Sequence, residues 1–395
     1  MTTLITNIGD LATCDQRRGS DRIGRITNAA MLFDERVLWI GPSHDAPDAD
    51  RVFDAEGRAV IPGFVDSHAH LLFAGDRTEE FVARMQGAPY GAGGIRTTVR
   101  ATREASDAAL DGNLQRLREE LLRHGVTHFE CKTGYGLTTH DEIRAAKIAA
   151  QATDDVTLLA AHVVPDEYRH EPDAYVDLII RDMLPTLAGV VRWVDVFCDE
   201  GAFTVAQAER LLVAAKALGY GIRMHANQLR HSAAVDLAID LGCASADHLT
   251  FLTDAQVQRI GASSTVATLV PGAEFSTRSQ YPSARRLLDA GATVAIATDC
   301  NPGSSFTTSM AMCIALAVRD MGMSPDEAVI AATSGGAAAL QRDEVGVLRP
   351  GALAHIVMLD APSTAHLAYR PGVHLIRDVW QAGQHVIDDW KPRHA

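Results

Sequence analysis

Eight apolar runs of strand length follow one another along the middle of the chain, and several of them end in polar residues. They cover residues 59–70, 126–136, 156–164, 191–201, 220–228, 243–249, 264–272 and 292–303. Segments such as 205–219 and 281–291 separate them, with apolar residues at helical spacing and a closing glycine. This alternation of strand and helix predicts the α/β class and a TIM-like (β/α)8 barrel. A doubly wound open sheet is the alternative, but no GxGxxG turn follows the first strand.

The two ends of the chain have a different pattern, in which short strands are separated by turns. The relevant segments are 37–43 and 51–60 near the start, and 346–360 and 375–387 near the end. Neither end is long enough to build a core alone, so we expect both termini to form one small β-sandwich domain together. The predicted boundaries are 1–60 and 346–395 for this domain, and 61–345 for the barrel.

Composition and charge narrow the range of partners. The chain has 395 residues, is 47% hydrophobic and carries a formal net charge of −14. An acidic chain without a basic patch is a poor candidate for binding nucleic acid or an anionic membrane surface. No run of about 18 apolar residues and no signal pattern occurs, so we expect no membrane span. Six scattered cysteines without a CxxC pair argue against a disulfide framework and favour a cytoplasmic protein.

Polar side chains that can hold a metal ion close several of the predicted strands. His68 and His70 end the first run in "GFVDSHAH", and residues two apart on a strand point to the same side. His225, His248 and Asp299 close the fifth, sixth and eighth runs. Each residue alone is explained at least as well as a strand-end cap or a solvated loop residue. Together, His68, His70, His225 and Asp299 form a nitrogen and oxygen ligand set for a divalent ion such as zinc, at the barrel mouth.

Longer motifs carry a resemblance to a known family. "PGFVDSHAH" and the "TD" that closes the eighth run resemble the amidohydrolase superfamily. "FAGDR", "KTGYGL", "VDVFCDEGAF", "SADHL", "ATLVPGAEF" and "TDCNPGSSF" are similar to the imidazolonepropionases within it, in the expected order and over nearly the whole chain. The resemblance implies a metal-dependent hydrolase. It would cleave the ring amide C–N bond of 4-imidazolone-5-propanoate to give N-formimidoyl-L-glutamate, the third step of histidine degradation.

The resemblance also implies a role for individual residues. His68, His70, His225 and Asp299 would bind one ion, zinc or iron, while Asp299 and His248 would handle the proton of the attacking water. Arg77 would hold the propanoate, because a guanidinium matches a carboxylate at two points, although a surface ion pair within "DRTEE" is the alternative. The other substrate contacts would come from Tyr135, His162, Gln228, Asn301, Gly303, Ser304 and Tyr90. For the Asn301–Ser304 stretch the alternative is a helix-opening turn with serine as N-cap. A homodimer is implied as well.

Two features of the sequence differ from those of many family members, and a third bears on the number of metal ions. Many family members have an acidic residue at the position of Gln228, and an amide cannot accept a proton, so the acceptor would be Asp299 or His248. The loop 87–95 is shorter than in many members. Two-metal relatives place a carboxylated lysine at the end of strand four, where this chain has "FCDEG". Lys132 lies on strand two, so we expect a single metal ion.

Two other functions fit parts of the pattern. A deaminase of the same superfamily would share the ligand set, but Arg77 and the "NPGSS" turn favour an acidic substrate. A barrel that has lost its chemistry would be expected to lack at least one ligand, and all four are present.

Overall fold

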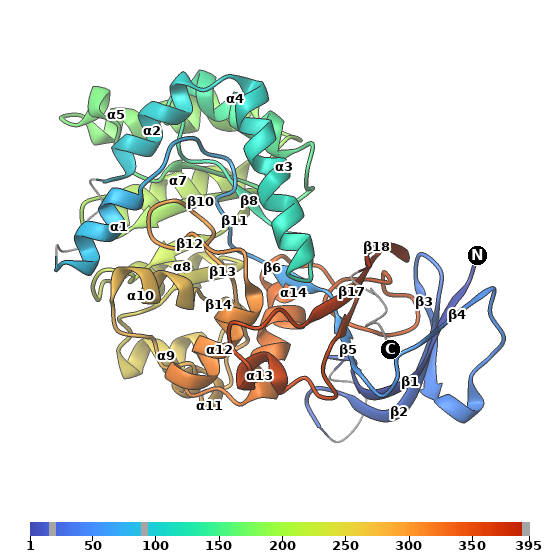
Figure 1. Ribbon diagram of the computed structural model, residues 1–395. Coiled ribbons are helices and arrows are strands. Elements are labelled where there is room, and N and C mark those ends of the chain that lie inside the picture. Colours follow the sequence, from blue (N-terminus) through green and yellow to red (C-terminus); the bar gives the residue numbers. More distant parts are fainter. Residues whose placement is uncertain (16–20, 88–93, 389–395) are drawn as a thin grey trace. The chain divides into compact units, whose positions relative to one another are not determined.

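The computed structural model describes residues 1–15, 21–87 and 94–388 (Figure 1). The chain divides into two compact units. The first comprises Met1–Asp66, Glu119–His128 and Ser309–Ala395, and the second comprises Ser67–Arg118 and Phe129–Thr308. The domain boundaries expected near residues 60 and 345 stay a prediction.

The second unit is built on a ring of parallel strands. Their order is β15-β14-β13-β12-β10-β9-β8, with β11 beside β10. The ring is closed by the segment 67–70: the amide of Lys132 donates to the carbonyl of Ala69 (2.9 Å), and the amide of His70 donates to the carbonyl of Cys300 (3.0 Å). The strands are β8 (Cys131–Lys132), β9 (Val156–Ala161), β10 (Trp193–Cys198), β11 (Gly221–Ile222), β12 (Met224–Ala226), β13 (Ser245–His248), β14 (Val266–Leu269) and β15 (Val294–Ile296). The predicted barrel is confirmed, and every one of the eight predicted runs contains a strand.

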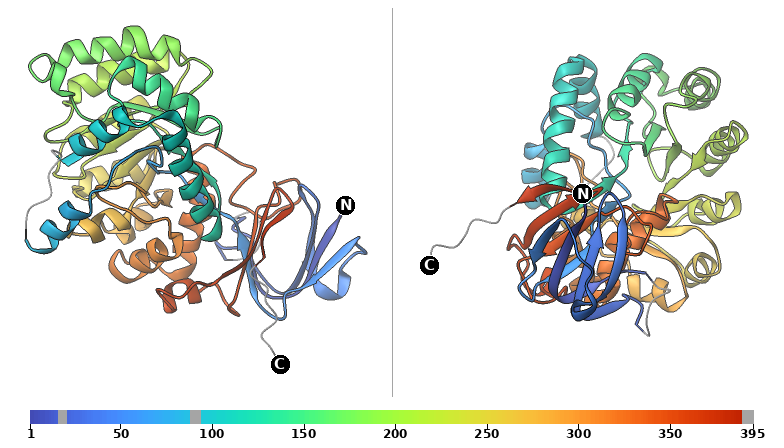
Figure 2. Two further views of the ribbon diagram at one scale, coloured as in Figure 1. Left: turned by 45° about the horizontal axis from the view of Figure 1, so that its top comes forward. Right: turned by 90° about the vertical axis from the view of Figure 1, so that its right-hand side faces the viewer.

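Helices cover the outer side of these strands (Figure 2). Helix α4 packs on β9, α7 on β10, α8 on β12 and β13, and α11 on β15. The helices that begin within this unit are α1 (Thr78–Met85), α2 (Ile95–Glu104), α3 (Asp107–Arg123), α4 (Thr139–Ala149), α5 (Pro172–Leu178), α6 (Leu184–Thr186), α7 (Val205–Ala217), α8 (Ala234–Leu241), α9 (Asp254–Gly261), α10 (Pro271–Thr277) and α11 (Ala284–Asp289). Because helices cover one side and the packed interior the other, β9 and β10 are buried along their whole length.

Local sequence signals account for where these helices start and stop. Helix α7 begins after Thr204, whose side chain accepts from the amide of Gln207 while the Gln207 side chain accepts from the amide of Thr204. Its buried face carries Leu211 and Leu212 one turn after Ala208. The chain then turns at Gly219, whose φ of +88° is a left-handed conformation that glycine adopts without a steric penalty.

The first unit contains a sheet to which both ends of the chain contribute. Its order is β18-β17-β16-β5-β1-β2-β3, and β4 pairs with β1. Its strands are β1 (Thr3–Ala12), β2 (Arg25–Phe33), β3 (Val37–Pro42), β4 (Arg51–Asp54), β5 (Ala59–Pro62), β16 (Ile356–Leu359), β17 (Ile376–Gln381) and β18 (Gln384–Asp388). The sheet folds over onto itself, because Phe33 of β2 and Trp380 of β17 meet at 6.0 Å between ring centroids although three strands separate them in the sheet. The small β-domain made from both termini is therefore confirmed, whereas β1 and β2 were not expected from the sequence.

The remaining elements complete the chain. Strands β6 (Phe64–Asp66) and β7 (Val126–Phe129) form a two-stranded sheet. The later helices are α12 (Met310–Asp320), α13 (Pro325–Ile330), α14 (Gly336–Ala339) and α15 (His366–Tyr369). Short 3₁₀ turns cover Ser43–Asp45 and Asp166–Tyr168, and π-helical turns cover Ile179–Met183 and Ala331–Gly335.

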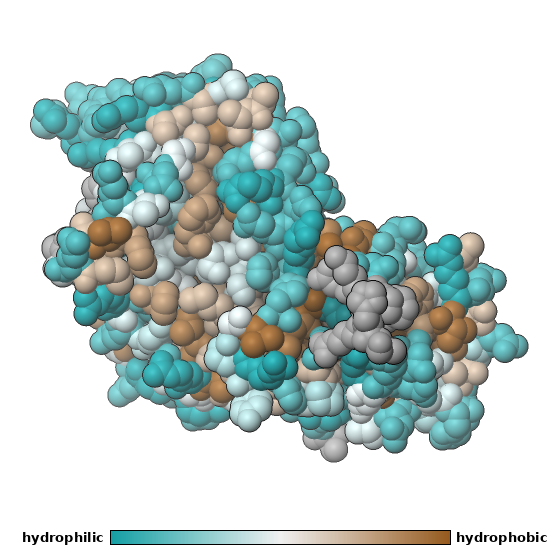
Figure 3. All heavy atoms as spheres, in the orientation of Figure 1, coloured by the Kyte–Doolittle hydropathy of each residue, from teal (hydrophilic) through white to brown (hydrophobic). Residues whose placement is uncertain are grey.

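The surface is mostly hydrophilic on the face drawn in Figure 3, where hydrophobic residues form separate patches. In the part of the chain that the structure describes, no helix has the length and apolar character needed to cross a membrane.

Replacing Trp380 with Ala should destabilise the small β-domain by about 3–5 kcal/mol, because the indole is fully buried against Phe33 and Phe53 and its removal leaves a cavity. Denaturant-induced unfolding would measure the loss. Leu38→Ala on β3 is the control, since this side chain is 43% exposed and its truncation should cost far less. Equal losses in both variants would contradict the packing described here.

Candidate metal site and pocket

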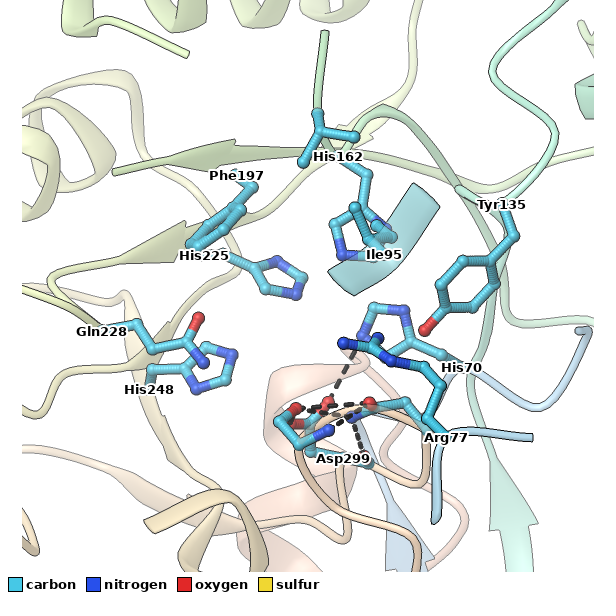
Figure 4. A pocket seen from close by; sticks show the side chains of 13 residues that line it. His70, Arg77, Ile95, Tyr135, His162, Phe197, His225, Gln228, His248 and Asp299 are labelled. Atoms are coloured by element: carbon cyan, nitrogen blue, oxygen red, sulfur yellow. Dashed lines mark hydrogen bonds and ion pairs between the residues drawn. The ribbon is translucent and has the colours of Figure 1, made fainter. Parts of the chain in front are cut away.

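Imidazoles and a carboxylate from different strands meet at the carboxyl ends of the barrel strands (Figure 4). The Nε2 atoms of His68 and His70 lie 3.3 Å apart. Asp299 Oδ1 lies 3.5 Å from His68 Nε2 and 3.4 Å from His70 Nε2. The ring of His225 lies 4.5 Å from that of His68 and 5.2 Å from that of His248, measured between centroids. Residues far apart in the sequence thus form one cluster because parallel strands end at one face.

The donor atoms of this cluster fit a divalent ion. Three buried groups have ligand atoms that all lie within 4.8 Å of one another: His68 with His70 and Asp299, His68 with His225 and His248, and Asp195 with His225 and Asp247. The four ligands expected from the sequence are therefore spread over two groups that share His68. His225 Nε2 is buried and has no hydrogen-bond partner within the described residues, as expected of an atom with a free lone pair for a metal ion. Three imidazoles and a carboxylate are a common ligand set for zinc.

Two buried carboxylates that the sequence analysis did not single out orient the imidazoles. Asp247 Oδ2 accepts from His68 Nδ1 at 2.7 Å. Asp195 Oδ2 lies 3.0 Å from His225 Nδ1. Carboxylates placed behind metal-binding histidines fix the ring orientation and leave Nε2 for the ion. Asp195 is the one charged residue in the apolar strand β10, which was an available sequence signal, whereas Asp247 lies among the polar residues of β13.

Lys132 balances the charge of these carboxylates. Its ammonium group is fully buried and lies 3.0 Å from Glu130 and 2.7 Å from Asp195. A third carboxylate, Asp247, lies 3.7 Å away. A buried lysine held by several carboxylates keeps its charge. This placement agrees with the expectation that Lys132 is not a metal ligand.

Burial and hydrogen bonding set the protonation states of the cluster. Burial lowers the pKa of His70 to about 4 and holds the pKa of His248 well below its usual range, so both rings are neutral at pH 7. Burial would raise the pKa of Asp299, but hydrogen bonds from His68 and His70 outweigh it and keep the pKa well below the usual value. Burial and Lys132 oppose protonation of His68, yet Asp247 and Asp299 raise its pKa to about 9. An ion would displace that proton, because a metal ligand must be unprotonated.

The backbone is strained where the strands reach the site. Asn227, His248, Leu249 and Asp299 have φ values of 53°, 76°, 61° and 51°. These left-handed conformations are costly for residues with a side chain. Asn227 immediately follows β12, His248 ends β13 and Leu249 follows it, and Asp299 lies shortly after β15. Such strain concentrates at sites where a side chain must be aimed at a ligand.

A pocket of about 40 Å³ opens beside the cluster and collects most of the residues expected to bind substrate. The expected residues on its wall are His70, Arg77, Tyr135, His162, His225, Gln228, His248, Asp299, Asn301 and Ser304. His68 lies behind this wall, against Asp247 and Asp299. Tyr90 lies outside the described residues. The apolar residues Ile95, Val163 and Phe197 also line the pocket, and sequence reasoning missed them.

Arg77 is buried in the wall of the pocket and also makes an ion pair. Its Nε and Nη2 donate to the Glu80 carboxylate at 3.1 and 2.6 Å. The ion pair considered as an alternative therefore exists, yet Arg77 is only 8% exposed and faces the pocket. Gly303 lies directly against the guanidinium, because a Cβ added there would meet Arg77 Nη1 at 2.1 Å. Any larger residue at position 303 would displace the arginine.

The turn that follows Asp299 is held by Asn301. The Asn301 carboxamide oxygen accepts from the amides of Gly303 and Ser304, both at 2.8 Å, while its amide nitrogen donates to the carbonyl of Asp299 at 2.6 Å. The alternative of a helix-opening turn with Ser304 as N-cap is wrong, because the next helix begins at Met310 and is capped by Ser309.

Tyr135 and His162 form another part of the pocket wall. The His162 ring stacks on His70 at 5.4 Å, and its Nδ1 lies 3.0 Å from the carbonyl of Gly134. Tyr135 lies 5.4 Å from His162 and is almost fully buried. Gly134 has a φ of +111°, which brings its carbonyl to the imidazole in a conformation that favours glycine.

Glu274 is a further buried carboxyl near the site that the sequence analysis did not single out. It lies on α10, and its Oε1 accepts from the Thr250 hydroxyl at 2.8 Å. Its Oε2 is buried without a hydrogen-bond partner among the described residues. Burial raises the pKa of this carboxyl to about 8.

Comparison with known proteins identifies related sequences and folds. Residues 59–386 match the model of the amidohydrolase family. The chain is 58% identical over 388 residues to the imidazolonepropionase of Streptomyces griseus subsp. griseus, covering 98% of this chain and 100% of the relative.

Solved structures share the fold at low sequence identity. A triazine hydrolase variant is similar with a TM-score of 0.78 and 18% identity, covering 100% of this chain and 96% of that one. An adenosine deaminase from Xanthomonas campestris with bound zinc has a TM-score of 0.66 and 20% identity, covering 98% and 93%. At these identities the likeness concerns the fold alone.

Replacing Asp247 with Asn should lower the affinity of the site for zinc about 10–100-fold, because the neutral amide no longer holds the His68 ring by a charged hydrogen bond. Competition with a chromophoric chelator would measure the affinity. Asp240→Asn is the control, since that carboxylate is 64% exposed and pairs with Arg259. An unchanged zinc affinity in the Asp247 variant would refute its orienting role.

Replacing Glu274 with Gln should change how stability depends on pH. The carboxyl has a pKa of about 8 when folded and about 4.5 in a free chain, so unfolding releases a proton between these values. The wild-type protein should therefore lose about 2–4 kcal/mol of stability as pH rises through this window, relative to the variant.

Thermal unfolding at pH 5 and pH 9 would test this prediction. Glu209→Gln, at an exposed position on α7, is the matched control and should behave as the wild type. A stability difference between the Glu274 variant and wild type that is the same at both pH values would contradict the assignment.

Proposed function

The chain belongs to the amidohydrolase family, and on that premise we propose that it hydrolyses the ring amide C–N bond of 4-imidazolone-5-propanoate. The product is N-formimidoyl-L-glutamate, in the third step of histidine degradation. The observation that carries the proposal is that one pocket combines the His/Asp cluster with a buried arginine. The imidazolonepropionase of Streptomyces griseus, similar over nearly its full length, supports the choice of substrate.

In the proposed site His68, His70, His225 and Asp299 would hold one divalent ion, zinc or iron. When bound, such an ion lowers the pKa of a water toward about 7 and polarises a carbonyl group. The choice between the two metals is left open by the ligand set, since imidazole suits both.

The residues around the ion handle the proton and the developing charge. Asp299 is ionised and accepts the proton of the attacking water. Asp299 then gives this proton to the leaving ring nitrogen. His248 has a neutral ring that donates a hydrogen bond toward the oxygen on which negative charge develops. A donor aimed at that oxygen in a closed site is worth roughly 3 kcal/mol in such reactions.

The remaining residues orient the substrate. Arg77 holds the propanoate, supported by the turn of Asn301, Gly303 and Ser304. Tyr135 and His162 contact the ring from one wall, and Gln228 contacts it from the other side. Tyr90 belongs to the proposal as a further substrate contact, on the sequence resemblance alone.

The setting of the enzyme is part of the proposal. We place it in the cytoplasm, since all six cysteines are buried and none is in a disulfide. We also propose that it works as a homodimer, as the sequence resemblance implies. The barrel spanning residues 61–345 is the proposed catalytic domain.

Incubation with freshly made 4-imidazolone-5-propanoate tests the function. The expected product is N-formimidoyl-L-glutamate without release of ammonia, and the Asp299→Ala variant should be inactive because it loses both a ligand and the proton acceptor. A deaminase acting on the ring of another substrate would instead release one ammonia per turnover. If the protein releases ammonia from a ring that carries an amino group and does not convert imidazolonepropionate, the proposal is wrong and the protein is a deaminase.

Replacing Arg77 with Ala should raise KM about 10–100-fold and leave kcat within a few-fold, because a charged hydrogen bond pair to the propanoate is lost. Steady-state kinetics would measure both constants. Arg77→Lys keeps the charge without the planar fork and should lie between wild type and Ala. If KM does not change, Arg77 does not bind the propanoate, and its ion pair with Glu80 is its only role.

A further inference from the structure

A second cavity adjoins the site on the same face of the barrel. It measures about 190 Å³, and its walls include Gln228, Phe251, Glu274, Thr277 and Ser279. These residues follow the neighbouring strands β12, β13 and β14, so the cavity opens at the carboxyl ends of the strands like the site itself. Gln228 lines both cavities, so they lie next to each other.

The position of Gln228 is fixed by its neighbours. Asp199 Oδ2 accepts from the amide of Leu229 at 2.9 Å, and the Asn227 side chain donates to the carbonyl of Phe251 at 2.9 Å. The loop after β12 is therefore tied both to the loop after β10 and to the loop after β13. In Figure 4, Gln228 and Arg77 lie on opposite sides of the first pocket, with His225, His248 and Asp299 between them. The second cavity therefore lies next to the side of the first pocket that is farther from Arg77.

Glu274 gives this cavity an acidic group without a cation to pair with. Its side chain is 2% exposed, Thr250 is its one hydrogen-bond partner among side chains of the described residues, and Oε2 has none. Burial of an unpaired carboxyl disfavours its charged form, which is reflected in the pKa of about 8. A group that weakens the fold and lines a cavity beside the site is a candidate for binding a ligand.

The chemistry of ring opening supplies a matching cation. Hydrolysis of the amide gives the hydroxyl of water to the carbonyl carbon and its proton to the ring nitrogen, as the C–N bond breaks. The new carboxylic acid then gives its proton to the freed N–C–N group. The product has two carboxylates and one amidinium, whereas the substrate had one carboxylate and a compact ring. The open chain is also longer than the ring, and the first pocket is small.

We propose that the cavity lined by Glu274 is a subsite for the amidinium end of the ring-opened product. The inference rests on the proposed function. The carboxylate of Glu274 accepts hydrogen bonds from the two amidinium nitrogens, since a carboxylate matches a planar N–C–N cation at two points. The hydroxyls of Thr277 and Ser279 and the carboxamide of Gln228 supply further polar contacts. Arg77 and Glu274 then hold the two oppositely charged ends of one molecule.

A pair of ligands that differ only in this cation tests the proposal. N-formimidoyl-L-glutamate carries the amidinium, and N-formyl-L-glutamate carries a neutral amide in its place. Calorimetry with the zinc-loaded wild-type protein at pH 8 should give about tenfold tighter binding of the formimidoyl compound, the size expected for one charged hydrogen bond. Equal affinities for the two compounds in the wild type would overturn the subsite without any variant.

The Glu274→Gln variant completes the test. It should bind the formimidoyl compound about tenfold more weakly than wild type and the formyl compound equally well, while Glu209→Gln should match wild type with both. A variant that keeps the wild-type preference for the formimidoyl compound would overturn the role of Glu274. Failure of the proposed function would look different, because the wild type would then neither convert 4-imidazolone-5-propanoate nor bind either glutamate derivative.

Discussion

The hydrogen bond between Asp247 and His68 is the contact on which the site depends. It joins residues 179 positions apart in the sequence and is completely buried. Asp247 fixes the ring of His68, and His68 is shared by the two groups of potential metal ligands that contain the four expected ligands. Because the carboxylate is charged and lies within reach of Lys132, it forms part of a buried network of opposite charges rather than a single pair. Such networks are stable only when every member is present.

The site separates charge along its length. Arg77 favours a carboxylate at one end, and the His/Asp cluster occupies the middle. The second cavity, with Glu274, is acidic at the other end. An overall negative charge of −14 opposes the approach of an anionic substrate, so local cations have to provide the attraction. A buried arginine achieves this, since the field of a charge is screened less inside a protein than in solution.

Several features of the site oppose the stability of the fold. The left-handed backbone conformations of Asn227, His248, Leu249 and Asp299 cost free energy, because residues with a side chain are more stable at negative φ. Glu274 is buried with one hydrogen bond, and burial lowers the pKa of His70, His162 and His248 so that these rings are neutral. These costs fall at the carboxyl ends of the strands, while the helices on the outer side pack with ordinary caps and apolar faces. The barrel therefore supplies the rigidity that the site lacks.

The sequence by itself determined the architecture and much of the chemistry. Alternating apolar runs and helical segments are local patterns, so the eight strand-containing segments and the helix at 205–217 could be predicted from neighbouring residues. His68, His70, His225, His248 and Asp299 could be found because each closes such a run. Strands β1 and β2 were missed, because an irregularity in their pairing between Ile5 and Ile8 interrupts the alternation in "TLITNIGDLA".

Only the tertiary structure decided which side chains meet. Asp195 and Asp247 lie on β10 and β13, and nothing in the sequence order places them behind particular histidines. The contact of Gly303 with Arg77 likewise involves residues that follow different strands. The same is true of the cavity lined by Gln228 and Glu274. The physical reason is that hydrophobic periodicity depends on neighbours three or four residues away, whereas these contacts depend on the closure of the barrel, which brings the ends of distant strands within hydrogen-bonding distance.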